Sequence, residues 1–239
     1  MTDGWEESAE AWMAEQGEEG DWSRRQVLDP VMLERVGRGG FKTALDIGCG
    51  EGRFCRAMAG LGIRATGIDP TEALIARARE LDLHGDYRLG RAEKLDLPDA
   101  SFDLVVSYLT IVDIAAIGLA IPEMARVLAP GGVLLIAQMT NFNTAAGPGG
   151  WVKDTDGRHL HWPVDNYLDE AVHWAEWNGI RVHNWHRPLS TYMALLLDAG
   201  LVLRLFLEPE PIGGEPEVVA RYRRAPFFMV MEWQKPASP

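Results

Sequence analysis

A glycine-rich turn between an apolar strand and a helix constrains the fold of this 239-residue chain more than any other feature. The apolar run Thr43–Ile47 ends at Gly48-Cys49-Gly50-Glu51-Gly52, and Phe54, Met58 and Leu61 then follow at helical spacing. Glycine lets the backbone approach a ligand without a Cβ atom in the way. Open α/β sheets bind their ligands at such turns, at the carboxyl ends of strands. We therefore expect a ligand-binding α/β sheet.

The spacing of the glycines narrows the class of ligand. The dinucleotide-binding pattern G-x-G-x-x-G requires a third glycine at the position of Arg53. A P-loop requires Gly-Lys-Ser or Gly-Lys-Thr, and the sequence contains no Gly-Lys pair. Here Asp46 precedes Gly48 by two residues, and Gly50 and Gly52 complete a G-x-G-x-G pattern. A dinucleotide oxidoreductase and a tight turn in an unrelated α/β protein remain the alternatives.

A second expected strand, Ile63–Ile68, ends at Asp69, about 20 residues beyond the glycine turn. At that distance an acidic side chain reaches the hydroxyls of a bound ribose. The alternative is that Asp69 caps the helix that begins near Thr71. Because Thr71 can cap that helix itself, we favour ribose binding for Asp69.

Two later motifs complete a pattern that resembles a known family. The stretch Gly90–Ser107 contains an Ala-Glu pair, a Leu-Pro pair and the expected strand Phe102–Ser107. In Met124–Ile136, a helix ends in Leu-Ala, the chain turns at Pro-Gly-Gly and an apolar strand follows. Over residues 40–138 the sequence resembles class I S-adenosylmethionine-dependent methyltransferases of the small-molecule type, related to the quinone-biosynthesis group. A weaker resemblance extends over 186–201.

The resemblance, together with the alternation of strands and helices, implies an α/β fold with a doubly wound, mostly parallel seven-stranded sheet and a small antiparallel lid. Strands are expected near 42–47, 63–68, 86–89, 102–107 and 132–138, and helices near 52–60, 71–81 and 114–128. A helix near 189–199 leads into a strand over 201–207. A further strand over 226–234 closes the sheet, and this last pair includes an antiparallel edge strand. We expect 1–239 to form a single methyltransferase domain.

Two segments lie outside this alternation. Residues 1–38 are expected to form an N-terminal helical cap, with a second helix from Arg24 to about Val36. Residues 139–187 are rich in tryptophan and histidine, and polar and apolar residues alternate near 159–162 and 180–185. Asn178-Gly179 is a hairpin signal. We expect an inserted substrate lid here, joined through a flexible glycine-rich connection and more mobile without ligand.

The resemblance implies S-adenosyl-L-methionine as cofactor and S-adenosyl-L-homocysteine as product. It places the turn against the methionine moiety, the acid after the second strand on the ribose, and the Ala-Glu pair at the adenine. The implied cofactor-binding residues are Arg24, Asp46, Gly48, Cys49, Gly50, Asp69, Pro70, Ala92, Glu93, Ser107 and Tyr108. For Arg24, pairing with the methionine carboxylate and a plain surface charge are equally acceptable.

A general base is expected among the polar residues near the acceptor. His186 is the first candidate, followed by Tyr108 and His161, because an imidazole takes up a proton near neutral pH. Since Pro188 and Ser190 favour a helix start, His186 is expected to project toward the site mouth. A structural histidine is the alternative. The expected substrate-binding residues are Trp162, Tyr167, Trp185, His186 and Tyr192.

Composition restricts the partners of the chain. A formal net charge of −12 disfavours nucleic acid and anionic membrane surfaces as partners. No apolar run reaches the ~18 residues of a membrane span, and the acidic N-terminus lacks the apolar core of a signal peptide. There is no His-Glu-x-x-His, and the two cysteines match no metal or disulfide pattern. We therefore expect a cytoplasmic monomer or homodimer that binds no metal.

The expected reaction is in-line transfer of a methyl group to a nucleophilic oxygen, nitrogen or carbon of a small molecule. The methyl group of S-adenosylmethionine is already activated, so the protein has to orient the acceptor and exclude water. A non-methylating S-adenosylmethionine-binding member of the same fold is the alternative.

Overall fold

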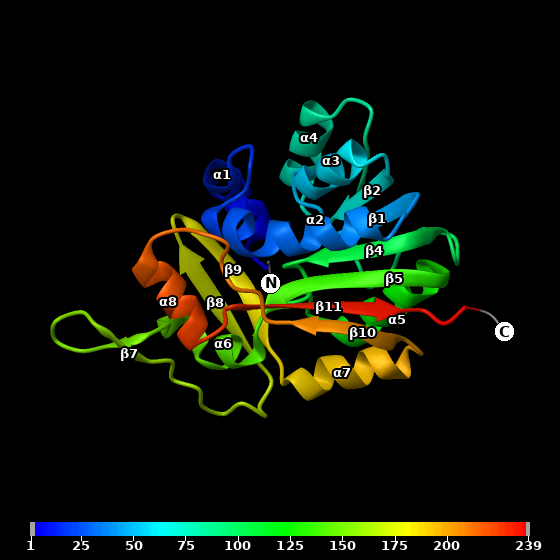
Figure 1. The fold of residues 1–239 in the computed structure, drawn as a ribbon. Coiled ribbons are helices and arrows are strands. Elements are labelled where there is room, and N and C mark those ends of the chain that lie inside the picture. Colours follow the sequence, from blue (N-terminus) through cyan, green and yellow to red (C-terminus); the bar gives the residue numbers. More distant parts are fainter. Residues whose placement is uncertain (1–2, 238–239) are drawn as a thin grey trace.

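The computed structural model describes residues 3–237, in which seven strands form one central sheet (Figure 1). The strand order is β10-β11-β5-β4-β1-β2-β3. The strands are β1 Thr43–Ile47, β2 Arg64–Asp69, β3 Asp86–Leu89, β4 Phe102–Tyr108, β5 Leu128–Met139, β10 Val202–Leu207 and β11 Phe228–Gln234. Strands β1 to β5 run parallel, whereas β11 runs antiparallel to β5 and β10. The predicted doubly wound, mostly parallel seven-stranded sheet is confirmed.

The end of the sheet differs from the expectation. Strand β11 lies inside the sheet, between β5 and β10, and β10 forms the edge. The apolar run of β11 fits that interior place, because Met229, Val230, Met231 and Trp233 are buried. By contrast, β10 alternates between exposed and half-buried residues, as an edge strand with one covered face does.

Helices cover both faces of the sheet, because successive residues of a strand point to opposite faces. In β1, Ala44 packs with α2 and α3 on one face, whereas Leu45 packs with α5 and α7 on the other. The helices flanking or following the strands are α2 Asp29–Arg38, α3 Arg53–Gly60, α4 Glu72–Leu81, α5 Ile117–Val127, α7 Leu189–Asp198 and α8 Pro216–Arg224. Helix α8 was not predicted; it begins at a proline, and none of its residues is buried.

The described part of the N-terminal segment contains two helices, whereas residues 1–2 of the predicted cap lie outside the described residues. Helix α1 spans Trp5–Gln16, and the second helix begins as a π-helical turn at Arg24–Leu28 before continuing as α2. Helix α1 contacts both α4 and strand β9 (Ile180–His186), so it bridges the sheet domain and the segment between β5 and α7 (Figure 1). Within residues 3–237 no helix combines the length and the apolarity that a membrane crossing requires.

The segment between β5 and α7 contains two separate antiparallel hairpins. Its elements are α6 Asn141–Ala145, a 3-10 turn at Gly147–Gly149, β6 Val152–Lys153, β7 His159–His161, β8 Ala171–Trp177 and β9 Ile180–His186. The Asn178-Gly179 turn is confirmed: both residues have positive φ, and Trp177 pairs with Ile180. Strand β7 pairs with β6 and not with β8 or β9, so the antiparallel part of this segment consists of two separate two-stranded sheets. The expected flexible connection contains helix α6.

Candidate functional site

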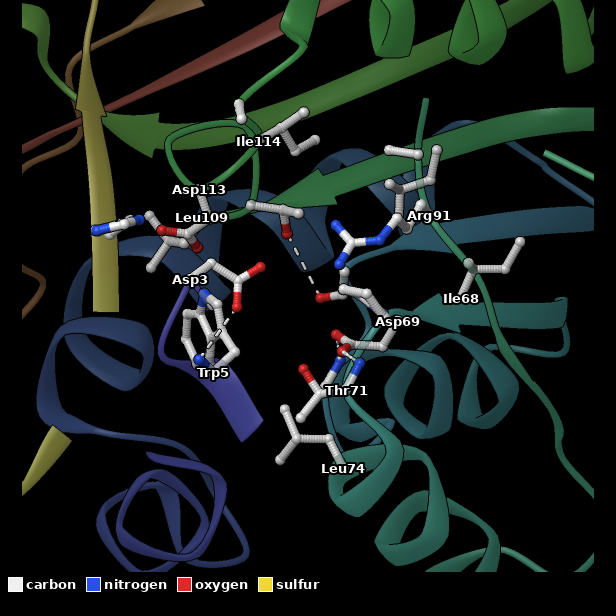
Figure 2. A pocket seen from close by; sticks show the side chains of 18 of the residues that line it. Asp3, Trp5, Ile68, Asp69, Thr71, Leu74, Arg91, Leu109, Asp113 and Ile114 are labelled. Carbon is white, nitrogen blue, oxygen red and sulfur yellow. Dashed lines mark hydrogen bonds between the residues drawn. The ribbon is translucent and has the colours of Figure 1, made fainter. Parts of the chain in front are cut away.

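A cavity of about 530 Å³ lies at the carboxyl ends of β1, β2 and β4. The strand order reverses between β1 and β4, so the loops after these strands diverge and leave a crevice. Its lining comes from these loops, from the N-terminal helices and from the β8–β9 hairpin. Figure 2 shows Asp3, Trp5 and Asp113 on one side of the cavity and Asp69 and Thr71 on the other.

The glycine turn after β1 forms one wall of the cavity. Gly48 has φ 71°, and a Cβ atom there would lie 2.2 Å from the Thr110 side chain. Gly50 has φ 55°, and a Cβ atom there would lie 2.9 Å from the ring of Trp12. Both positions therefore require glycine for backbone conformation and for space. The turn is held by the Gly48 amide, which donates to the Ile68 carbonyl at 2.7 Å.

Asp69 closes the adjoining wall and fixes two backbone segments. Its Oδ2 accepts a hydrogen bond from the Gly50 amide at 2.9 Å, and its Oδ1 accepts one from the Thr71 amide at 2.8 Å. Asp69 is therefore already engaged by two backbone amides. Burial raises the pKa of Asp69, although these amides oppose the shift. A carboxylate has about four lone-pair positions, so Asp69 retains acceptor capacity toward a ligand.

Helix α4 is capped by a residue from α1. The Thr71 side chain makes no capping hydrogen bond. Instead, the Glu6 carboxylate accepts from the Glu72 amide at 2.9 Å and from the Ala73 amide at 3.1 Å. An acidic group at a helix N-terminus satisfies unpaired amides and interacts favourably with the helix dipole. Sequence reasoning missed this contact because the two partners are more than sixty residues apart.

Asp46 lies behind the turn and does not line the cavity. Its Oδ2 accepts from the Cys55 thiol at 3.5 Å, and its Oδ1 has no partner among residues 3–237. Burial raises the pKa of Asp46 to about 7. The hydrogen bond from Cys55 opposes this shift, whereas the charge of Asp69 adds to it. Ser107, at the end of β4, also has a buried hydroxyl without a partner in the described chain. Like Cys49, Ser107 lies outside the lining.

Arg24 and Tyr108 line the cavity beside the glycine turn. The Arg24 guanidinium pairs with Asp21 and lies 5.7 Å from the centre of the Tyr108 ring. The Tyr108 hydroxyl donates to Asp29 Oδ1 at 2.7 Å. Burial, with the charge of Asp29, raises the pKa of Tyr108 well above its ordinary value, so this phenol keeps its proton. The geometry therefore argues against Tyr108 as a general base.

His186 ends β9 with a buried side chain that does not line the cavity. Its Nδ1 lies 2.8 Å from Thr144 Oγ1, and its Nε2 lies 2.9 Å from the Tyr167 carbonyl oxygen. The expected projection toward the site mouth was wrong, because both ring nitrogens are engaged in packing α6 and the β7–β8 connection against β9. The geometry favours the structural alternative.

The other predicted acceptor-side residues are dispersed. Trp185 lines the cavity, whereas His161, on the β6–β7 hairpin, does not. Trp162 packs edge-on against Trp151. Tyr192 is buried in the core beneath the sheet. The predicted residues that do line the cavity are Arg24, Gly48, Gly50, Asp69, Pro70, Ala92, Glu93, Tyr108 and Trp185.

Several lining residues were missed by sequence reasoning. Asp3 and Trp5 enter from the start of α1, Asp113 from the turn after β4, and His183 from β9. The one available signal was Asp113, a lone acid in the apolar stretch Ile111–Ile114 at the sheet's switch point. Across residues 3–237, no group of three or more histidine, cysteine, aspartate or glutamate side chains is arranged to hold a metal ion.

Comparisons with known proteins agree with this geometry. A family model described as a methyltransferase domain matches residues 45–136. The crystal structure of an S-adenosylmethionine-dependent methyltransferase from Mesorhizobium loti is 30% identical, with a TM-score of 0.72; the match covers 85% of this chain and 95% of that one.

Two curated relatives match shorter stretches. A ubiquinone biosynthesis O-methyltransferase of Maricaulis maris is 38% identical over 106 residues, which cover 42% of this chain and 42% of the relative. A malonyl-[acyl-carrier protein] O-methyltransferase of Yersinia pestis is 32% identical over 117 residues, which cover 49% of this chain and 44% of the relative. The chain thus spans less than half the length of these curated relatives. Because the Mesorhizobium loti methyltransferase is 30% identical over 85% of this chain and a methyltransferase domain matches residues 45–136, the chain belongs to the family of S-adenosylmethionine-dependent methyltransferases.

Proposed function

We propose that this protein transfers a methyl group from S-adenosylmethionine to a nucleophilic oxygen, nitrogen or carbon atom of a small molecule. The observation that carries the proposal is that one cavity contains both the glycine turn with Asp69 and an aromatic wall formed by Trp5, Trp12 and Trp185. The glycine turn and Asp69 suit a nucleoside with an amino-acid tail. The aromatic wall suits a flat acceptor molecule that packs against the tryptophan rings.

The residues present fit the cofactor. At Gly48 and Gly50 the backbone itself lines the cavity, so a ligand can approach it without a side chain in between. Asp69 offers acceptor positions to ribose hydroxyls, and Ala92 and Glu93 line the part of the cavity in which we expect the adenine. When bound, S-adenosylmethionine supplies a methyl group on a positively charged sulfur.

Arg24 is the cation that suits the methionine carboxylate, because its guanidinium lines the cavity next to the turn. The pair with Asp21 and the faces of Trp12 and Tyr108 hold the guanidinium in place. An arginine presents several fixed donors, which match the geometry of a carboxylate. The alternative of a plain surface charge fits less well with a half-buried side chain that lines the cavity.

Orientation and exclusion of water are the remaining tasks. Positioning two reactants can lower a barrier by about 7–11 kcal/mol. Helix α1 contributes Trp5 and Trp12 to the cavity wall and is tied to α4 by Glu6. The volume of about 530 Å³ is in the range of small-molecule sites. Because the protein carries a net charge of −12, we expect it to act without nucleic acid. We also expect it to act in the cytoplasm, as a monomer or homodimer.

Calorimetric titration with S-adenosylhomocysteine tests the proposal. Asp69→Ala should weaken binding by about 1.5–3 kcal/mol, the range for hydrogen bonds to a charged group. Asp156→Ala is the matched control, because Asp156 is exposed in the turn between β6 and β7. Equal affinities in wild type and Asp69→Ala would contradict the ribose assignment. Incubation with S-adenosylmethionine and a metabolite extract should form S-adenosylhomocysteine, whereas a non-methylating member of the fold would form none.

A further inference from the structure

Asp113 is a carboxylate held in a fixed orientation at the cavity wall. It lies in the turn after β4, and Asn184 Nδ2 donates to its Oδ1 at 2.6 Å. Strand β9, which contains Asn184, makes a second hydrogen bond to this turn: the Trp185 amide donates to the Val112 carbonyl at 2.7 Å. In the part of the chain that the structure describes, no other hydrogen bond reaches the Asp113 carboxylate. Its Oδ2 is therefore available to a molecule in the cavity.

The surroundings of Asp113 are acidic and aromatic. Asp3 lies on the same side of the cavity, and Asp69 lies across from it (Figure 2). Burial and the charges of Asp3 and Asp69 raise the pKa of Asp113 well above that of an ordinary carboxyl, against the Asn184 hydrogen bond and the charge of Arg24. This end of the cavity therefore opposes a further negative charge.

This arrangement discriminates between chemical classes of methyl acceptor. A carboxylate placed here would lose its water next to Asp3 and Asp113, and the nearby cations are already engaged by other groups. Arg24, held by Asp21, is the cation assigned above to the methionine carboxylate, and Arg91 lies on the opposite side with Asp69. Arg187 is buried, and its guanidinium donates to the Ile114 and Ala115 carbonyls. A hydroxyl or an amine would instead donate a hydrogen bond to Asp113 Oδ2, and its flat body would pack against Trp5 and Trp185.

We propose, building on the methyl-transfer function above, that the acceptor is a hydroxyl or an amine on a flat, mostly apolar molecule, not a carboxylate, and that Asp113 receives its proton. The lone pair of the acceptor oxygen or nitrogen forms the new bond to the methyl carbon. The carbon–sulfur bond breaks, and its electron pair stays on sulfur, which becomes a neutral thioether. The proton leaves the acceptor for Asp113 Oδ2, so charge and atoms balance. Asn184 is a positioning residue in this scheme.

Three probes that share a phenylethyl group test the recognition step: 2-phenylethylamine, 2-phenylethanol and 3-phenylpropionate, which are cationic, neutral and anionic near neutral pH. Each is titrated into wild-type protein saturated with S-adenosylhomocysteine, with tryptophan fluorescence as the readout. We expect the amine and the alcohol to bind and the carboxylate to bind at least about tenfold more weakly. Asp113→Asn should lower the affinity for the amine probe about ten- to hundredfold, so the difference in affinity between the amine and the carboxylate probe should become smaller. The matched control Asp198→Asn, at an exposed position on α7, should change neither.

The pH dependence separates an ionising Asp113 from a structural one. Below pH 9 the amine probe stays cationic, so its affinity should rise with pH as Asp113 ionises, with a midpoint above that of an ordinary carboxyl. Asp113→Asn should remove this rise. Asp3, Asp69, His183 and Arg24 also face this end. A pH response that persists in Asp113→Asn but vanishes in His183→Gln would overturn the assignment to Asp113.

The outcomes also separate this inference from the methyltransferase function. Wild-type protein that fails to bind S-adenosylhomocysteine would overturn both. Normal binding of S-adenosylhomocysteine would leave the function intact, and three results would then overturn this inference alone. These results are a carboxylate probe that binds as tightly as the alcohol, a ranking unchanged in Asp113→Asn, and a protein that binds none of the three probes. Asn184→Ala keeps the Asp113 carboxylate but removes the hydrogen bond that holds it. This variant should lower the affinity for the amine probe less than Asp113→Asn does.

Discussion

The two ends of the cavity are built in different ways. At the cofactor end, Asp69 is the last residue of β2, and Gly48, Gly50 and Ala92 lie within about three residues of the ends of β1 and β3, so local sequence fixes their place. At the acceptor end, the lining comes from α1, from the turn after β4 and from β9. These segments are far apart in the sequence and meet only through tertiary contacts. A cofactor site shared by a fold can therefore be carried in short motifs, whereas an acceptor site is assembled by packing.

Gly48→Ala should break the cofactor end most strongly. The substitution forces a positive φ on alanine and puts its Cβ atom 2.2 Å from Thr110, so the turn must move. We expect S-adenosylhomocysteine binding to become undetectable by calorimetry, with a loss of about 1–3 kcal/mol in the free energy of unfolding. The matched control is Gly60→Ala, at a helical glycine with open space around it. Unchanged cofactor affinity in Gly48→Ala would show that the turn does not shape this end.

The motifs of the cofactor end made most of the fold predictable. The strand before Gly48 and the strand that ends at Asp69 both appear within a residue or two of the expected bounds, because their apolar runs end in turn residues. The Asn178-Gly179 turn was predictable for the same reason, since positive φ at both positions requires such residues.

The acceptor end was not predictable to the same degree. His186 is held by one hydrogen bond to the Thr144 side chain and one to the Tyr167 carbonyl, and both depend on how α6 packs. No periodicity in the sequence predicts that packing. The meeting of Asp113 with Asn184 likewise depends on the docking of β9 on the turn after β4. The expected mobility of 139–187 remains a prediction, which hydrogen exchange with and without S-adenosylhomocysteine tests.

Asp46→Asn should change the pH dependence of stability. Burial raises the pKa of Asp46 to about 7 from 3.8, so the folded protein holds this proton more tightly than the unfolded chain. Wild type should therefore lose stability as pH rises from about 4 to about 7, whereas the variant should not lose this contribution. The stability of the variant relative to wild type should grow by up to about 4 kcal/mol across that window. Urea denaturation at several pH values measures it.

Asp86→Asn provides the control of opposite sign. The hydrogen bond from Arg88 lowers the pKa of Asp86, so its contribution is present above the unfolded pKa and is lost as pH falls through the folded pKa. The variant should therefore be less stable than wild type near neutral pH, and this difference should shrink in acid. A relative stability of Asp46→Asn that does not vary with pH would mean that Asp46 is not buried in the folded protein.

Ser8→Ala should loosen the acceptor end with a smaller effect. The Ser8 hydroxyl donates to the Arg181 carbonyl at 3.1 Å and accepts from the Arg181 amide at 2.9 Å, which ties α1 to β9. Loss of both bonds should cost about 1–3 kcal/mol and speed hydrogen exchange in β9. The affinity for S-adenosylhomocysteine should change less than in Gly48→Ala. Ser190→Ala, at an exposed position, is the control. If the cofactor were lost from Ser8→Ala as completely as from Gly48→Ala, the two ends would not be separable.

A crystal structure of the protein with S-adenosylhomocysteine tests the account most directly. We expect ribose hydroxyls within hydrogen-bond distance of Asp69, the adenine beside Ala92, and the sulfur facing the end of the cavity that holds Asp113 and Trp185. S-adenosylhomocysteine bound outside this cavity, or with its sulfur turned away from Asp113, would contradict it.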